Sequence, residues 1–66
     1  MSMLKVIEVL AESDQNWEGA AQSAVKQAGK SVRNIKSIYI KDMEATVENG
    51  KIARYRINAK ISFLLD

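Results

Sequence analysis

Residues 47–52, VENGKI, join two runs that are rich in β-branched and aromatic residues, 34–47 and 52–64. Asn49-Gly50 at the centre of the join is the strongest short hairpin signal, because both residues tolerate the positive φ angles of a two-residue type I′ turn. The stretch therefore predicts a β-hairpin whose register starts at its tip. In that register residue 48 faces 51, 47 faces 52, and the pairing continues down both strands.

The segments before the hairpin complete a β-α-β-β order. Residues 3–11, MLKVIEVLA, are rich in Val, Ile and Leu and predict a first strand. Residues 17–30 carry one apolar stripe, mostly alanine, at helical spacing, and Asn16 is a candidate N-cap. The third strand most simply lies between the other two. We therefore expect one α+β domain over residues 1–66, with a three-stranded antiparallel sheet packed on one helix.

Alternation along the hairpin divides its side chains between two faces. Toward the helix we expect Ile38, Ile40, Ala53, Tyr55, Ile57, Ala59, Ile61 and Phe63. On the other face we expect Ser37, Tyr39, Lys41, Met43, Ala45, Val47, Ile52, Arg54, Arg56, Asn58, Lys60 and Ser62. The uniform register puts Arg56 opposite Met43, roughly 20 Å along the strand from Ser37. It also makes the hairpin tip apolar on this second face, and exposed apolar patches mark interfaces.

Composition narrows the function classes. A chain of 66 residues has a marginal core, and without Cys it has neither disulfides nor thiolate metal sites, so oligomerisation is the remaining means of stabilisation. The absence of His removes the commonest general base, and we do not expect an enzyme. The net charge of +2, with interspersed signs, does not favour a nucleic-acid partner. The N-terminal run is too short and too charged for a signal peptide or membrane span, so we expect a cytoplasmic, soluble protein without a membrane partner.

Acidic residues follow one another at even spacing in KDMEATVEN, residues 41–49. Asp42, Glu44 and Glu48 fall on one side of the predicted strand. Neighbours two apart lie about 7 Å from each other, which is too wide for both to bind one ion closely. Contacts from other subunits could complete an oxygen cage. The alternative is a solvated acidic edge near the hairpin.

Over nearly its whole length the chain resembles the dodecins, small flavin-binding proteins whose β-α-β-β subunits assemble into hollow dodecamers. The resemblance lies in the order and spacing of four stretches rather than in any single motif. They are KVIEVLAES, NWEGAAQSAVKQA, VRNIKSIYIKDMEATVENGKI and YRINAKISF. It implies a homododecamer with sheets lining the interior and helices outside, and with flavins bound in pairs at subunit interfaces.

The resemblance also locates the flavin contacts. The family's stacking tryptophan falls at Ser37, and a glutamine that contacts the isoalloxazine edge falls at Arg56, so this chain departs from the pattern at both positions. Asp42 and Glu44 fall close to where the family contacts the flavin. Trp17 starts the helix, where we expect it to anchor packing. Some tryptophan-lacking dodecins are described as calcium-associated.

Two cage hypotheses therefore remain, together with one from a different class. The first is a homododecamer that binds, stores or buffers a flavin (riboflavin or FMN), more weakly or in a different pose than tryptophan-bearing members do. The second is a cage that takes a divalent cation such as calcium, another nucleotide-like cofactor, or nothing. The third is a small basic nucleic-acid-binding module, which the dispersed charge and few exposed aromatics disfavour.

Overall fold

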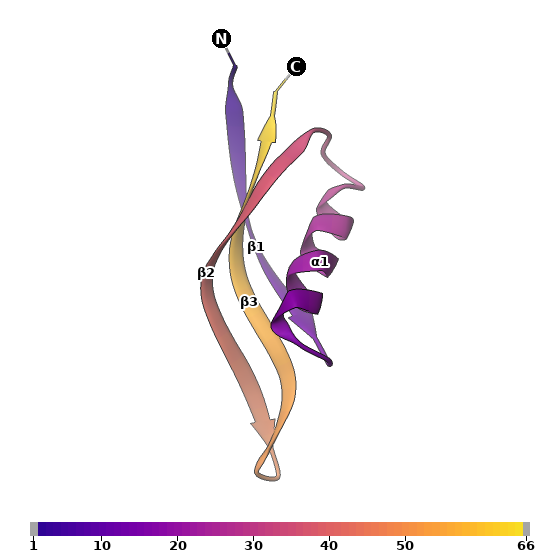
Figure 1. Ribbon diagram of the computed structural model, residues 1–66, viewed down its shortest axis with the longest axis vertical. Helices are drawn as coiled ribbons and strands as arrows, with labels where there is room; N and C mark the ends of the chain where they lie inside the picture. The colour runs from indigo at the N-terminus through magenta and orange to yellow at the C-terminus, as the bar shows by residue number, and fades with distance from the viewer. Residues whose placement is uncertain (1, 66) are drawn as a thin grey trace.

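The computed structural model describes residues 2–65, which form β1 (Leu4–Ser13), α1 (Trp17–Ala28), β2 (Ile35–Glu48) and β3 (Lys51–Leu64). The strands form one antiparallel sheet in the order β1-β3-β2. Figure 1 shows α1 lying along one side of this sheet and the β2-β3 hairpin extending past the end of the helix. The predicted α+β order and the central place of the third strand are confirmed.

The helix begins where the sequence predicts it. The Asn16 side chain accepts a hydrogen bond of 2.6 Å from the Gly19 N–H, which confirms Asn16 as the N-cap. The helix ends at Ala28, before the predicted residue 30. The reason is that the N–H groups of Lys30 and Ser31 bond to carbonyls only three residues back, which tightens and closes the last turn.

The core lies between α1 and the middle strand. Ala20 of the helix and Ile57, Ala59 and Ile61 of β3 are fully buried. Alanine on the helix lets the two backbones approach closely, as the alanine stripe predicts. Since Ile57 and Ile61 are the only large side chains in residues 2–65 that are fully buried, the core is small.

The hairpin turn confirms the type I′ prediction, with φ of 53° at Asn49 and 74° at Gly50. The predicted register also holds at the tip, where Val47 faces Ile52, and near the far end, where Ser37 faces Ser62 before a further irregularity at Ile35. Between these ends the register is shifted by one residue. Irregularities between Ile40 and Asp42, and between Thr46 and Val47, start and end the shift.

The shift corrects the predicted faces. Met43 lies opposite the buried Ile57, and Ala45 lies opposite Tyr55, so both belong to the helix side and not to the open side. Arg56 lies opposite Glu44 and not Met43. The prediction was wrong here because a bulge inserts one residue on one strand and reverses every side chain beyond it, and hydrophobic alternation does not reveal it.

The subunit is long and thin for its length. Its extents are 51 × 20 × 13 Å and its radius of gyration is 13.5 Å, whereas a compact domain of this length has about 11 Å. It exposes 5078 Å² of surface, against about 4,200 Å² for a folded monomer of its mass. No helix within residues 2–65 is both long and apolar enough to span a membrane.

Candidate functional site

The sheet face opposite α1, here called the open face, is built from alternate residues of all three strands. Cross-strand pairing assembles its rows, because partners that face each other project to the same side. Three rows hold the side chains of interest. They are Glu12–Arg56–Glu44, Leu10–Asn58–Asp42 and Val6–Ser62–Ser37.

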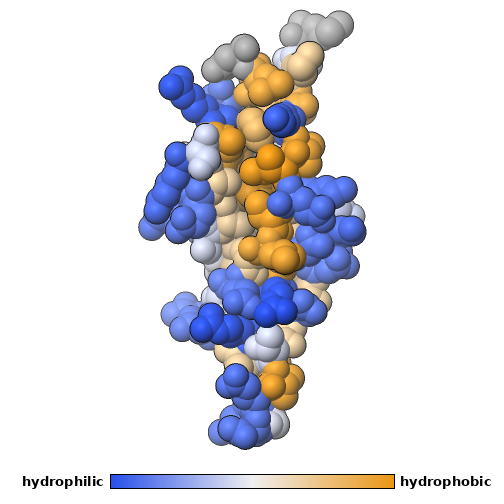
Figure 2. Space-filling view, turned by 180° about the vertical axis from the view of Figure 1, so that it is seen from behind, coloured by the Kyte–Doolittle hydropathy of each residue, from blue (hydrophilic) through white to orange (hydrophobic). Residues whose placement is uncertain are grey.

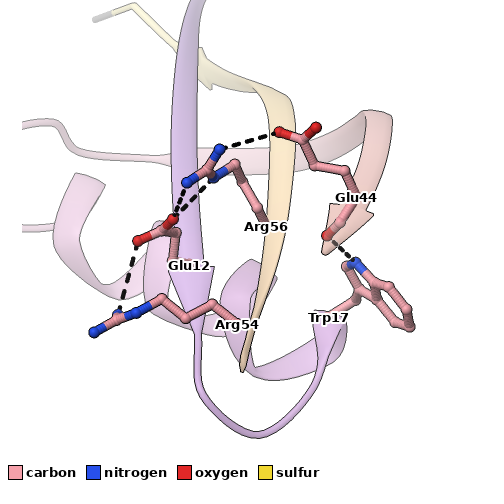
Figure 3. Close-up of polar contacts among 5 residues, drawn as sticks. All are labelled: Glu12, Trp17, Glu44, Arg54 and Arg56. Atoms are coloured by element: carbon pink, nitrogen blue, oxygen red, sulfur yellow. Dashed lines mark hydrogen bonds and ion pairs between the residues drawn. The ribbon is translucent and has the colours of Figure 1, made fainter. Parts of the chain in front are cut away.

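Arg56 is the centre of the first row. Its Nε and one terminal nitrogen donate to the Glu12 carboxylate of β1 at 2.8 and 2.6 Å. Its other terminal nitrogen donates to Glu44 of β2 at 3.4 Å. Arg54 approaches the second Glu12 oxygen at 3.7 Å. Figure 3 shows this network running across the three strands.

The network changes the electrostatics of Arg56. The hydrogen bond and charge of Glu12, with a smaller contribution from Glu44, raise the pKa of the guanidinium above its ordinary value. Two carboxylates already neutralise this cation. Its donors toward Glu12 are also occupied in a planar, two-point geometry. Arg56 is therefore not a free anion-binding group.

Ser37 lies at the other end of the open face. Its hydroxyl and that of Ser62 are hydrogen-bonded to each other across the hairpin. The third member of the row, Val6 of β1, is 54% exposed. The nearest aromatic side chain on this face is Tyr39, one row away opposite Lys60 and 64% exposed. Among residues 2–65 of one subunit, no flat ring lies at Ser37 itself on which a ligand could stack.

Asp42 and Glu44 both lie on the open face, opposite Asn58 and Arg56. Glu48 lies beyond the second irregularity, opposite Lys51, at the hairpin tip. The Asn58 side-chain oxygen has almost no exposed surface and no hydrogen-bond partner among residues 2–65. Within residues 2–65 no group of three or more acidic side chains gathers closely enough to hold a metal ion.

The structure does not bring the predicted site residues together in one subunit. Asp42, Glu44 and Arg56 form a group, whereas Ser37 and its partner Ser62 lie six residues along β3 from Arg56, roughly 20 Å away. A single planar ligand cannot span both groups on one chain. The predicted separation is therefore unchanged by the corrected register.

Sequence reasoning missed two residues that contact members of this group, Glu12 at Arg56 and Trp17 at Glu44. Glu12 lies at the end of β1, where the sequence indicates only a turn, and its role follows from the β1-β3 register. Trp17 donates its indole N–H to the backbone carbonyl of Glu44 at 2.9 Å. Its ring also makes an edge contact with Tyr55, with centroids 4.8 Å apart. Trp17 anchors packing, as expected, and in addition binds β2.

A three-stranded sheet that carries one helix on one face and polar rows on the other defines a β-α-β-β assembly subunit. A family model, Dodecin, matches residues 3–66. The chain therefore belongs to the dodecin family. The subunits of this family assemble into hollow dodecamers.

Two relatives illustrate the match. Calcium dodecin of Mycobacterium tuberculosis is 35% identical over 63 residues, which cover 96% of this chain and 89% of the relative. Its crystal structure, described as that of a calcium-chelating antigen with a novel calcium-binding site, shares 36% identity. That structure has a TM-score of 0.83 over 98% of this chain and 93% of the other.

Dodecin of Thermus thermophilus is 24% identical over 62 residues, which cover 94% of this chain and 90% of the relative. The crystal structure of one of its single-residue variants has a TM-score of 0.94 at 23% identity, covering 100% of this chain and 98% of that one. At this identity the likeness supports the shared fold alone.

Proposed function

We propose that this chain is the subunit of a homododecameric cage that binds and buffers a small ligand on its open face, without catalysing a reaction. We place this cage in the cytoplasm, with no nucleic-acid or membrane partner. The surplus of exposed surface carries the proposal, because 5078 Å² is about a fifth more than a monomer of this mass exposes.

Part of that surplus is apolar and lies on β1. Leu4, Val6 and Leu10 point to the open face and are 56%, 54% and 73% exposed. Fully burying one such side chain contributes about 1.5–3 kcal/mol. Contact between subunits along β1 would therefore stabilise the assembly and leave the polar rows of the open face toward the cage interior.

Flavin, as riboflavin or FMN, is the ligand class we propose first. The residues at the family's two flavin positions do not form its stacking site, because Ser37 bonds to Ser62 and Arg56 is already paired with Glu12 and Glu44. The exposed Tyr39 ring offers a stacking surface one row away. Ser37, Arg56, Asp42 and Glu44 would then border the ligand from different subunits.

The loss of tryptophan stacking sets the expected affinity. An aromatic pair contributes about 0.5–1.5 kcal/mol beyond area burial, so we expect flavin affinity up to about tenfold lower than in tryptophan-bearing dodecins. Purified protein is titrated into riboflavin and into FMN while flavin fluorescence is followed, with the mass measured by size-exclusion light scattering. A dodecamer that leaves fluorescence unchanged at saturation would exclude flavin, and a stable monomer would exclude the cage.

A divalent cation such as calcium is the second candidate ligand. The 35% identical relative is named calcium dodecin, and Asp42 and Glu44 share the open face. Because no acidic cluster of three exists within residues 2–65 of one subunit, neighbouring subunits would have to supply further oxygens. Calorimetric titration of chelator-treated protein with Ca²⁺, and with Mg²⁺ as the comparison, tests this. Binding heats that are absent for both ions would exclude it.

A further inference from the structure

The shift in the β2-β3 register is made by two bulges that cancel each other. One adds a residue to β2 between Ile40 and Asp42, and the other adds a residue to β3 opposite the step from Thr46 to Val47. Because the additions are on opposite strands, the pairs at the tip and at the far end are the same with or without them. A uniform register over the central segment is therefore available without moving either end.

The two registers place different side chains on the open face. In the observed register Glu44 faces Arg56 and Thr46 faces Arg54. In the uniform register Met43 would face Arg56 and Ala45 would face Arg54. The side chains of Asp42 and Glu44 would then turn toward the helix, and the open face would lose both carboxylates.

Two side-chain contacts of β2 residues 42–46 differ little in free energy between the observed and the uniform register. Met43 is still 58% exposed on the helix side, so little apolar surface is gained there. The Glu44 side chain is 63% exposed, and an ion pair that exposed contributes little. A contact that does differ between the two registers is the hydrogen bond from the Trp17 indole N–H to the Glu44 carbonyl, at 2.9 Å.

This hydrogen bond can form in only one of the two registers of β2. β2 is an edge strand, and on an edge strand every second residue turns its backbone groups away from the neighbouring strand. A one-residue slip would turn the Glu44 carbonyl toward β3 and remove the acceptor from Trp17. Figure 3 shows the indole reaching this carbonyl while the carboxylate of the same residue reaches Arg56.

We propose that Trp17 is a positioning residue that selects the bulged register of β2 and so keeps Asp42 and Glu44 on the open face. It acts from the first turn of α1, where the edge contact with Tyr55 orients its ring. In this orientation the indole N–H bonds to a β2 carbonyl that faces away from β3, which in the observed register is that of Glu44. The proposal concerns the register alone and holds whatever ligand the cage takes.

Cysteine pairs test the register, because the chain has no native Cys. The first pair, Thr46→Cys with Arg54→Cys, joins residues that face each other in the observed register. The second pair, Ala45→Cys with Arg54→Cys, joins residues that would face each other only in the uniform register. Directly opposed positions meet the Cα separation of a disulfide, about 4.4–6.8 Å, with their Cβ atoms on the same face, whereas Cβ atoms that point to opposite faces of the sheet cannot be bridged.

Each pair is oxidised mildly in the wild-type, Trp17→Phe and Trp17→Ala backgrounds, and disulfide formation is quantified by mass spectrometry. With Trp17 only the first pair should close. Trp17→Phe keeps a ring against Tyr55 but has no N–H. We therefore expect closure of the second pair to rise about fivefold, the change in an equilibrium on losing one ordinary hydrogen bond.

Asn16→Ala is the matched control, because it weakens the same helix terminus without touching the Trp17 contact with Glu44. It should leave the second pair open. The proposal is overturned if the second pair stays open in Trp17→Phe and Trp17→Ala proteins that remain folded by circular dichroism. It is equally overturned if Asn16→Ala closes that pair as efficiently as Trp17→Phe does.

Discussion

Ser37, which we propose borders the ligand, bonds through its hydroxyl to the hydroxyl of Ser62 and offers no aromatic surface. Because the row is open toward Val6 and solvent, we expect Ser37→Trp to fit without disturbing the core and to increase flavin quenching. Riboflavin fluorescence titration measures the gain. Ser37→Ala is the control, since it removes the hydroxyl without adding a ring. A Ser37→Trp dodecamer that quenches no more than Ser37→Ala would show that the site is closed for another reason.

Arg56 keeps two carboxylates from different strands on one cation. Arg56→Gln should lower the melting temperature, because Glu12 and Glu44 would lose the cation between them, and only the more distant Arg54 would remain beside Glu12. The additional change Glu12→Gln should recover most of the loss, and ~1 M NaCl should shrink it by screening. Melting temperatures of the single and double variants, measured by thermal unfolding, test whether repulsion between Glu12 and Glu44 causes the loss. A double variant no more stable than Arg56→Gln would rule out the repulsion.

The sign of the pH effect at Arg56 follows from its pKa, which the hydrogen bond and charge of Glu12 raise above the ordinary value of a guanidinium. A group whose pKa is higher in the folded protein contributes stability that is fully present below its unfolded-state pKa. That stability is lost only as the pH rises through the folded-state pKa. The titration of Arg56 should therefore leave stability flat from about pH 6 to pH 9. The difference in melting temperature between wild type and Arg56→Gln, measured across this range, is expected to stay constant.

At the scale of elements, the β2-β3 turn sets where the hairpin starts. Gly50 has φ of 74° and its added Cβ would meet no atom within 4 Å, so only backbone strain opposes a larger residue. We expect Gly50→Ala to cost about 1–2 kcal/mol. Gly29→Ala is the comparison, because Gly29 has an ordinary helical φ of −62°. Chemical denaturation measures both, and equal losses would refute strain as the cause.

At the scale of the whole molecule, the subunit is too thin to bury its own apolar side chains. Leu10 is 73% exposed on the open face, and Gln22 is exposed on α1. Figure 2 shows hydrophobic groups along the middle of the upper part of the molecule seen from behind, flanked by hydrophilic ones, with a hydrophilic band crossing below them. We expect Leu10→Glu to shift the mass from dodecamer toward smaller species, and Gln22→Glu, with the same added charge, to leave it unchanged. Light scattering provides the mass, and an intact Leu10→Glu dodecamer would place the contact elsewhere.

The sequence by itself determined the elements and their order. Asn49-Gly50 dictated the turn, Asn16 the start of the helix, and the alanine stripe the close approach of α1 to Ala59 and Ile57, because each is a local rule of backbone geometry or periodicity. Local rules reach a few residues, and these features lie within that reach. The register at the hairpin tip was predictable for the same reason, whereas Ser37 faces Ser62 as predicted only because the two bulges cancel.

Only the tertiary structure decided which side chains share the open face. The bulge after Ile40 turns Asp42 and Glu44 toward Arg56, and the β1-β3 register brings Glu12 to the same cation from more than forty residues away. Trp17, at the far side of the sheet, holds this arrangement through a backbone carbonyl. A bulge depends on contacts between strands and helix that alternation within one strand does not record, and so the fold could be predicted and the composition of the site could not.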